Sequence, residues 1–229
     1  KNLIVFLHGD GSPNSPRPGI PKKSQIRFAK ELINDDNNIF LFARPGYFIR
    51  ERGSSEEDRY SSGPRNAIKS TVVNYDWKNF QILAPALQNL KKYYKPKKLI
   101  LIGHSGGAYQ GGTIHGKVPG LVDINILISC PCDWEIRKKL SNGKKWETKS
   151  QLKELKKNSP SFNYKNIDLK SLNILIVGKD DKNTAPGVSK YYYDLLKKKK
   201  LQVKLHIIDG GHGLRSMPTI GSIIKEYIN

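Results

Sequence analysis

The sequence predicts an α/β fold, with a mainly parallel six-stranded sheet and helices on both of its faces. Short apolar runs, typical of strands buried on both faces, alternate with segments whose apolar residues recur at helical spacing. Turns containing glycine, proline or aspartate follow these runs. The 229 residues suit one α/β domain with a large core and are too few for two ordinary domains. We therefore expect a single domain over residues 1–229.

The first half of the chain supplies three strands and two helices. In order, these are a strand at 3–7, a helix beginning near Ser24, a strand at 39–43, a helix from Asp76 or Trp77 to about Tyr94, and a strand at 99–102. Ser24 suits the N-cap of the first helix, because its hydroxyl can accept a hydrogen bond from a free backbone N–H. Residues 48–75 are polar and charged, and we interpret them as a long loop at the sheet edge.

The second half supplies three more strands and a long insertion. In order, the expected elements are a helix that stops near Gly116, strands at 124–129, 174–177 and 203–208 with a helix at 187–199 between the last two, and a closing helix. Residues 135–172 are rich in lysine and contain two expected helices, at about 135–140 and 149–157. This segment is too long for a simple crossover, so we expect a small cap over the strand ends.

Polar motifs follow the expected strands, and the carboxyl ends of parallel strands are where chemistry collects. One of them, Gly103-His-Ser-Gly-Gly107, lies between a strand and a helix, which is typical of a nucleophile elbow. Small residues permit the tight turn and leave the Ser105 hydroxyl exposed, while the helix N-terminus offers N–H groups to an oxyanion. The five letters alone also arise by chance in glycine-containing loops, so the context has to decide.

A serine hydroxyl becomes a good nucleophile when a base takes its proton, and a buried carboxylate orients that base best. Of the five histidines, His212 follows the last strand between glycines, on a loop able to reach Ser105, and we expect it to be the base. The other four suit structural roles, in the elbow with the side chain directed away from Ser105 (His104), the first turn (His8), a helix end (His115) and a strand (His206).

Three carboxylates are candidates for the acid that orients His212. Asp181 lies in the loop after the penultimate strand and is the favoured one. Asp180 is its neighbour, with a solvated loop carboxylate as the alternative interpretation. Asp133 follows the preceding strand, where an N-cap of the next helix is the alternative.

The chain order Ser105, Asp181, His212 matches that of the α/β-hydrolase superfamily. More narrowly, five motifs resemble small serine hydrolases of the prolyl-oligopeptidase and dienelactone-hydrolase-like branch: His8-Gly-Asp-Gly11, Arg44-Pro-Gly-Tyr47, Gly103-His-Ser-Gly-Gly107, Ser129-Cys-Pro-Cys-Asp133 and Gly178-Lys-Asp-Asp-Lys-Asn-Thr184. The resemblance covers nearly the whole chain. In departure from the family pattern, we expect six strands, without the first two that are usual in this family, and no β-propeller ahead of the catalytic domain.

This resemblance implies an oxyanion hole made by the backbone N–H groups of Asp10 and Gly106. Only the backbone of Asp10 is needed, and we expect its side chain to turn away from the developing anion. Four aromatic residues are candidate walls of the acyl or alcohol pocket, with plain core or cap packing as the equal alternative: Tyr47, Tyr109, Trp134 and Trp146.

The leading functional hypothesis is a carboxylesterase-like serine hydrolase that forms an acyl-Ser105 intermediate on a small-molecule ester. A peptidase of the same fold acting on short peptides is the second hypothesis. A catalytically silent module that binds polyanions through its basic surface is the third. We expect no cofactor and no metal, because no set of His, Asp and Glu has ligand spacing.

The chain carries 40 Lys and Arg against 20 Asp and Glu, a formal net charge of +20. The lysines are spread along the chain and lie mostly near expected helix ends, which favours a solvated surface over a functional basic face or a specific nucleic-acid site.

No apolar stretch is long enough for a membrane span. Export with a removed leader and a cytoplasmic location both stay open. Cys130 and Cys132 are two residues apart, and we expect so small a disulfide ring to be unfavourable.

Overall fold

The computed structural model describes residues 1–10, 19–20, 23–45, 48–49, 75–141, 149–213 and 217–228. Its main feature is a parallel six-stranded sheet, as predicted. The strand order, which the sequence did not predict, is β3-β1-β5-β6-β7-β8. The strands are β1 (Asn2–Leu7), β3 (Asn37–Phe42), β5 (Leu99–His104), β6 (Ile124–Ile128), β7 (Leu172–Gly178) and β8 (Gln202–Ile208). A separate two-stranded parallel sheet pairs β2 (Gly19–Ile20) with β4 (Phe48–Ile49).

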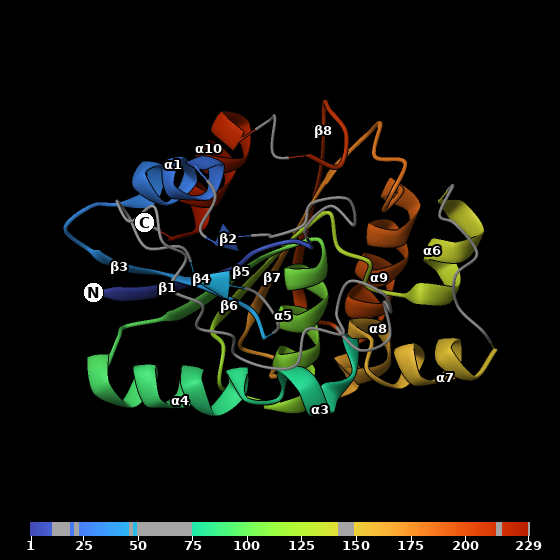
Figure 1. The fold of residues 1–229 in the computed structure, drawn as a ribbon, viewed down its shortest axis with the longest axis horizontal. Helices are drawn as coiled ribbons and strands as arrows, with labels where there is room; N and C mark the ends of the chain where they lie inside the picture. The colour runs from blue at the N-terminus through green and yellow to red at the C-terminus, as the bar shows by residue number, and fades with distance from the viewer. Residues whose placement is uncertain are drawn as a thin grey trace.

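Helices cover both faces of the six-stranded sheet (Figure 1). They are α1 (Lys23–Leu32), α3 (Trp77–Phe80), α4 (Leu83–Tyr94), α5 (Gly106–Lys117), α6 (Trp134–Leu140), α7 (Lys149–Lys157), α8 (Pro160–Asn163), the 3₁₀ helix η2 (Tyr164–Asn166), α9 (Pro186–Lys198) and α10 (Met217–Ile228). Helices α1 and α10 pack on one face, and α4, α5 and α9 pack on the other. Within the described parts of the chain, no helix has the length and apolar character needed to cross a membrane.

The interior strand β1, between β3 and β5, explains why both faces of the sheet need cover. Leu3, Val5 and Leu7 pack against α4 and α5, whereas Ile4 and Phe6 pack against α1 and α10. All five side chains are buried. A strand that is apolar on both faces requires a helix layer on each side to remove its surface from water.

Two helix boundaries differ from the prediction. The helix expected over 76–94 is divided into α3 and α4, because Pro85 has no N–H to donate to the carbonyl of Gln81. The N–H of Ala84 bonds that carbonyl instead, at 3.0 Å. Helix α1 already includes Lys23, so Ser24 lies within its first turn and is not the N-cap.

The segment 135–172 is largely helical where it is described, and residues 142–148 lie outside the described residues. Helices α6 and α7 correspond to the two predicted helices, whereas α8 and η2 were not predicted. Helix α6 packs against α7 and α9, at the side of the sheet where β7 and β8 lie. Of the expected loop at 48–75, only residues 48–49 and the last residue are described.

Candidate active site

Ser105 lies in a tight turn between β5 and α5. Its backbone has φ 51° and ψ −116°, a conformation that is strained for a residue with a side chain. Two close approaches require the flanking glycines. A Cβ at Gly103 would lie 2.5 Å from the Cα of Ala108, and a Cβ at Gly107 would lie 2.1 Å from the carbonyl oxygen of Leu7. This turn therefore has the geometry of a nucleophile elbow.

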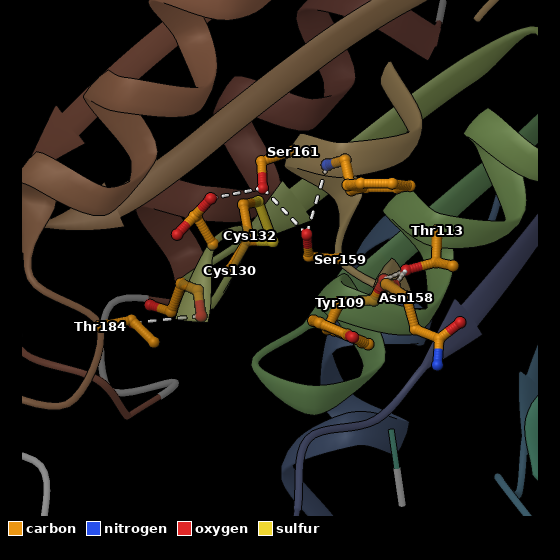
Figure 2. Close-up of a disulfide and its surroundings, with 11 residues drawn as sticks. Tyr109, Thr113, Cys130, Cys132, Asn158, Ser159, Ser161 and Thr184 are labelled. Carbon is orange, nitrogen blue, oxygen red and sulfur yellow. Dashed lines mark hydrogen bonds between the residues drawn. A yellow bond between two sulfur atoms is a disulfide. The ribbon is translucent and has the colours of Figure 1, made fainter. Parts of the chain in front are cut away.

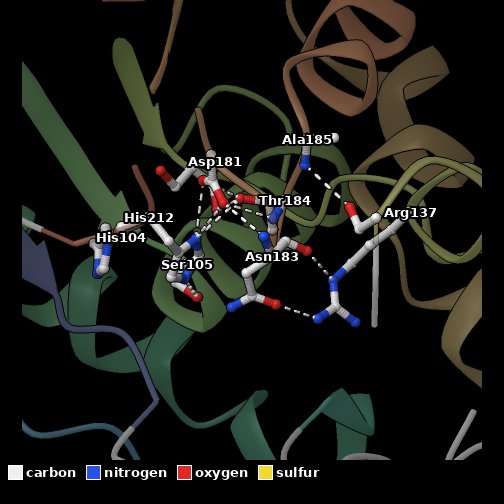
Figure 3. A network of polar contacts seen from close by, with 10 residues as sticks. His104, Ser105, Arg137, Asp181, Asn183, Thr184, Ala185 and His212 are labelled. Carbon is white, nitrogen blue, oxygen red and sulfur yellow. Dashed lines mark hydrogen bonds and ion pairs between the residues drawn. The ribbon is translucent and has the colours of Figure 1, made fainter. Parts of the chain in front are cut away.

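The side chains of Ser105, His212 and Asp181 form one hydrogen-bonded series at the carboxyl edge of the sheet (Figure 3). His212 Nε2 lies 2.9 Å from Ser105 Oγ. His212 Nδ1 lies 2.9 Å from Asp181 Oδ2 and 3.2 Å from Oδ1. Because a carboxylate can only accept, Nδ1 carries the ring hydrogen and Nε2 accepts from the Ser105 hydroxyl. In this arrangement His212 can take the proton of Ser105.

Asp181 is buried in the loop that follows β7. Its carboxylate accepts hydrogen bonds from the backbone N–H groups of Asn183 (2.9 Å) and Thr184 (2.8 Å), and from Thr184 Oγ1 at 2.7 Å. Burial by itself raises the pKa of Asp181, but the hydrogen bond and charge of His212, with the bonds from Thr184, outweigh it and lower the pKa to about 2. The carboxylate is therefore ionised at neutral pH.

The two alternative carboxylates lie in other surroundings. Asp133 is the N-cap of α6, where it accepts from the N–H of Ile136 (2.9 Å) and from Ser161 Oγ (2.7 Å). Asp180 is exposed. Of the three candidates, Asp181 is the one hydrogen-bonded to His212. Among the described residues, no group of three or more His, Cys, Asp or Glu side chains is arranged to hold a metal ion.

The loop after β1 brings Asp10 beside Gly106, the first residue of α5. We expected the Asp10 carboxylate to turn away from this place, and that expectation was wrong. The carboxylate lies against Gly106: a Cβ at Gly106 would be 2.5 Å from Asp10 Oδ1. Arg44 Nη1 donates to the same oxygen at 2.8 Å, and the Tyr75 hydroxyl donates to Oδ2. The carboxylate is held there by two donors from other segments, which sequence reasoning did not anticipate.

The sequence matches a family model over residues 33–226, and the description of that model is the prolyl oligopeptidase family. The chain belongs to the prolyl oligopeptidase family. It is accordingly a hydrolase of the serine peptidase and esterase superfamily. No curated protein sequence matches it significantly.

Three solved structures are similar to this family member. An acylaminoacyl peptidase of Pyrococcus horikoshii is 18% identical with a TM-score of 0.72, over 98% of this chain and 36% of that one. A puromycin-hydrolyzing peptidase of Mycobacterium tuberculosis is 14% identical with a TM-score of 0.72, over 99% and 33%. An esterase of Pyrococcus furiosus is 17% identical with a TM-score of 0.61, over 100% and 84%. The likeness shows the α/β-hydrolase fold, and this chain spans about a third of the length of the two peptidases.

Two of the candidate pocket residues of this family member lie in an aromatic cluster. Tyr109 exposes no surface, and its hydroxyl donates to the carbonyl of Leu155 at 2.7 Å, which favours the packing alternative. Trp134 exposes 4%, and its ring contacts Tyr75 at 5.1 Å between centroids. The other two candidates, Tyr47 and Trp146, lie outside the described residues.

Two residues that support His212 were not predicted. Thr184 Oγ1 lies 2.7 Å from Asp181 Oδ2 and 3.1 Å from both the carbonyl of Ser129 and His212 Nδ1. His104 Nε2 lies 3.0 Å from the carbonyl of His212, which can only accept, so Nε2 carries a hydrogen. Loss of hydration, followed by the charge of His212, lowers the pKa of His104 to about 4. His104 is thus a neutral donor to the His212 loop rather than a packing residue alone.

Cys130 and Cys132 form a disulfide in the loop between β6 and α6 (Figure 2), contrary to the expectation from their spacing. Their Cα atoms are 5.1 Å apart, which is within the usual range for disulfides, because the backbone of the single residue between them, Pro131, brings them close enough. Both cysteines are buried. The carbonyl of Ser129, next to this disulfide, is the one that Thr184 contacts.

Proposed function

We propose that this chain hydrolyses small carboxylic esters through an acyl intermediate on Ser105, with His212 as the general base and Asp181 as the carboxylate that orients it. The hydrogen-bonded series from Ser105 Oγ through His212 to Asp181, at a strained strand-to-helix turn, supports this function most directly. Such a series activates a hydroxyl that is otherwise a weak nucleophile. The chemistry needs no cofactor.

In the first half-reaction, Ser105 Oγ attacks the ester carbonyl carbon while its proton moves to His212 Nε2. The carbonyl π pair moves onto the carbonyl oxygen, which gives a tetrahedral oxyanion. When this intermediate collapses, the bond to the alcohol oxygen breaks and the leaving alkoxide takes the proton from His212. Acyl-Ser105 and free alcohol remain.

In the second half-reaction, water gives a proton to His212 and attacks the acyl carbon. Collapse breaks the bond to Ser105 Oγ, which takes the proton back, and the carboxylic acid leaves. Asp181 stays ionised in both halves, because its lowered pKa of about 2 keeps the proton on His212. The imidazolium formed in each half-reaction is stabilised by that charge.

We assign the oxyanion hole to the backbone N–H groups of Asp10 and Gly106. Gly106 begins α5, where the N–H groups have no partner within the helix and the helix dipole is positive. The loop after β1 brings Asp10 beside Gly106, with Asp10 Oδ1 2.5 Å from where a Cβ of Gly106 would lie, which supports Asp10 as the source of the second donor. Fixed donors of this kind contribute roughly 10²- to 10³-fold each to kcat in acyl transfer.

We further propose that residues 135–172 form a cap beside this site, with Trp134 at its base as a pocket wall. Arg137 on α6 donates from Nε to the carbonyl of Asn183 (3.0 Å) and from Nη2 to Asn183 Oδ1 (2.5 Å). Asn183 also donates its backbone N–H to Asp181. These contacts attach α6 to the loop that carries the proposed orienting acid.

A peptidase is the second candidate, because the family takes its name from prolyl oligopeptidase and two of the similar structures are peptidases. Two other similar structures are esterases, so the relative turnover of an ester and an anilide decides between the two candidates.

The test of the function is labelling with a fluorophosphonate, which reacts with activated serines, followed by turnover of p-nitrophenyl esters and aminoacyl anilides. We expect the wild-type chain to be labelled and to prefer the short-chain ester. Ser105→Ala should abolish both signals. Ser222→Ala, which changes an exposed serine on α10, is the matched control and should behave as the wild type.

Three results would change the assignment. Labelling that survives in Ser105→Ala would remove Ser105 as the nucleophile. Faster turnover of the anilide than of the ester would favour the peptidase. Absence of labelling in the wild type, together with retention on heparin at moderate salt, would favour the silent polyanion-binding module.

A further inference from the structure

The Asp10 carboxylate lies where a bound oxyanion would be affected by its charge. A Cβ at Gly106 would lie 2.5 Å from Asp10 Oδ1, 2.7 Å from the hydroxyl of Tyr75 and 2.8 Å from Arg44 Nη1. Three polar groups thus converge on the residue whose N–H is one of the two proposed oxyanion donors. A carboxylate this close to a forming oxyanion opposes it by charge repulsion.

Arg44 is placed to cancel that charge. It exposes no surface, and its Nη1 donates both to Asp10 Oδ1 at 2.8 Å and to the carbonyl of His8 at 2.9 Å. The Asp10 side chain keeps 34% of its surface exposed, whereas the guanidinium is enclosed. A buried guanidinium is normally kept with its acid, because removing one partner leaves an uncompensated charge.

Arg44 also joins the two segments that carry the proposed donors. Its Nε donates to Gln110 Oε1 at 2.8 Å, one helical turn after Gly106 on α5. Its backbone N–H donates to His8 Nε2 at 3.0 Å, which places the ring hydrogen of His8 on Nδ1, 2.7 Å from the carbonyl of Gly9. One residue therefore holds the loop after β1 against the first two turns of α5.

We propose that Arg44 is a positioning residue for acyl transfer: it fixes the N–H groups of Asp10 and Gly106 relative to one another, and it cancels the charge of the Asp10 carboxylate beside the oxyanion. This inference rests on the proposed function of Ser105. The proposal predicts opposite effects on the oxyanion from loss of the Arg44 charge and loss of the Asp10 charge. Loss of the Arg44 charge leaves a negative charge beside the oxyanion, whereas loss of the Asp10 charge leaves a positive charge that favours it.

The test compares Arg44→Met, Asp10→Asn and the double variant, by kcat and KM for p-nitrophenyl acetate and by the rate of fluorophosphonate labelling. We expect Arg44→Met to lower kcat about 100-fold with little change in KM, as for loss of an oxyanion donor. Asp10→Asn should change kcat by less than about tenfold, and the double variant should recover at least about tenfold over Arg44→Met, since the repelling charge is gone.

Equal losses in the two single variants, or no recovery in the double variant, would overturn the proposal and leave Arg44 with a structural role. Circular dichroism identifies variants that do not fold. If Arg44→Met is one of them, Arg44→Lys replaces it: with the charge kept, this variant should retain more than about a tenth of the wild-type kcat, and a larger loss would overturn the electrostatic role. A wild-type chain that is neither labelled nor active would instead overturn the proposed function itself.

Discussion

His212 is held by hydrogen bonds at its ring and at its backbone. Asp181 accepts from the ring Nδ1, and His104 donates to the carbonyl of the same residue. The loop that carries His212 follows β8 and contains Gly210 with φ 121°, a conformation open mainly to glycine. A loop of this kind has no regular ladder of its own, so the bond from His104 fixes the height of the imidazole above Ser105.

We expect His104→Leu to lower kcat about fivefold, because one hydrogen bond to the His212 loop, worth about 1 kcal/mol, is lost. His104→Gln is the matched control, since its amide can donate to the same carbonyl, and it should keep most of the activity. The measurement is kcat with a p-nitrophenyl ester. Full activity in His104→Leu would leave His104 with packing alone.

Sequence reasoning at this scale indicated Ser105, His212 and Asp181 by motif and chain order. It did not indicate Arg44 or Thr184 as their supports. Both act through hydrogen bonds to segments far away along the chain, such as the 55 residues that separate Thr184 from Ser129. No local pattern of residue types encodes a contact of that kind.

At the scale of elements, the disulfide lies in the turn between β6 and α6, beside the loop that carries Asp181. The two cysteines that it joins are separated by only two positions in the sequence, so the disulfide closes a very small ring. Because loop-closure entropy grows with loop length, a ring this small restricts the unfolded chain only slightly. Its contribution is therefore expected to be modest compared with that of ordinary disulfides.

We expect the double variant Cys130→Ala/Cys132→Ala to lose about 1.6 kcal/mol of unfolding free energy, the value of the chain-entropy relation for a three-residue loop. The melting temperature should fall by roughly 3–6 °C. Differential scanning calorimetry measures this, with tris(carboxyethyl)phosphine-treated wild type as the control. A wild-type chain that reacts with iodoacetamide after denaturation without reductant would show that the disulfide is not formed.

The division of the expected helix at 76–94 shows what helical spacing detects and what it overlooks. The apolar period continues through both α3 and α4, so the buried face was predicted, with Phe80, Leu83 and Leu87 in the core. The break at Pro85 depends on a single missing N–H, to which a periodicity argument is insensitive.

At the scale of the whole molecule, two histidines make folding sensitive to acid. His115, in the last turn of α5, exposes no surface, and loss of hydration lowers its pKa to about 4. The pKa of His104 is lowered to about 4 as well, also chiefly by loss of hydration. Between about pH 6.5 and pH 4 the unfolded chain binds these protons and the native chain does not, so stability falls as the pH falls.

We expect the unfolding free energy to decrease by roughly 3 kcal/mol per histidine from about pH 6.5 to pH 4. Urea unfolding at several pH values measures this slope. In His115→Leu, the fall in unfolding free energy between about pH 6.5 and pH 4 should be smaller by the roughly 3 kcal/mol that His115 contributes. The residues around Ser105 should keep their positions. An unchanged slope in that variant would contradict a neutral, buried His115.

The net charge of +20 is also a property of the whole molecule. The last turns of α4 and α9 carry lysine pairs, Lys91-Lys92 and Lys197-Lys198, where the helix dipole favours cations. One of these, Lys91, donates to the carbonyl of Leu121 and pairs with Asp123. Placement at helix ends agrees with the solvated-surface interpretation of the charge.

The six strands and the positions of the principal turns can be predicted from residue order, because burial on two faces demands apolar runs and tight turns demand small residues. Chain order also placed Ser105, Asp181 and His212 after strands that end at one edge. Which groups meet there follows from the folded structure: the carboxylate that bonds His212, the disulfide near that loop, and the Arg44–Asp10 pair against Gly106. Those choices depend on distances of a few ångströms between segments far apart in sequence, which are set by the packing of the whole sheet and its helices.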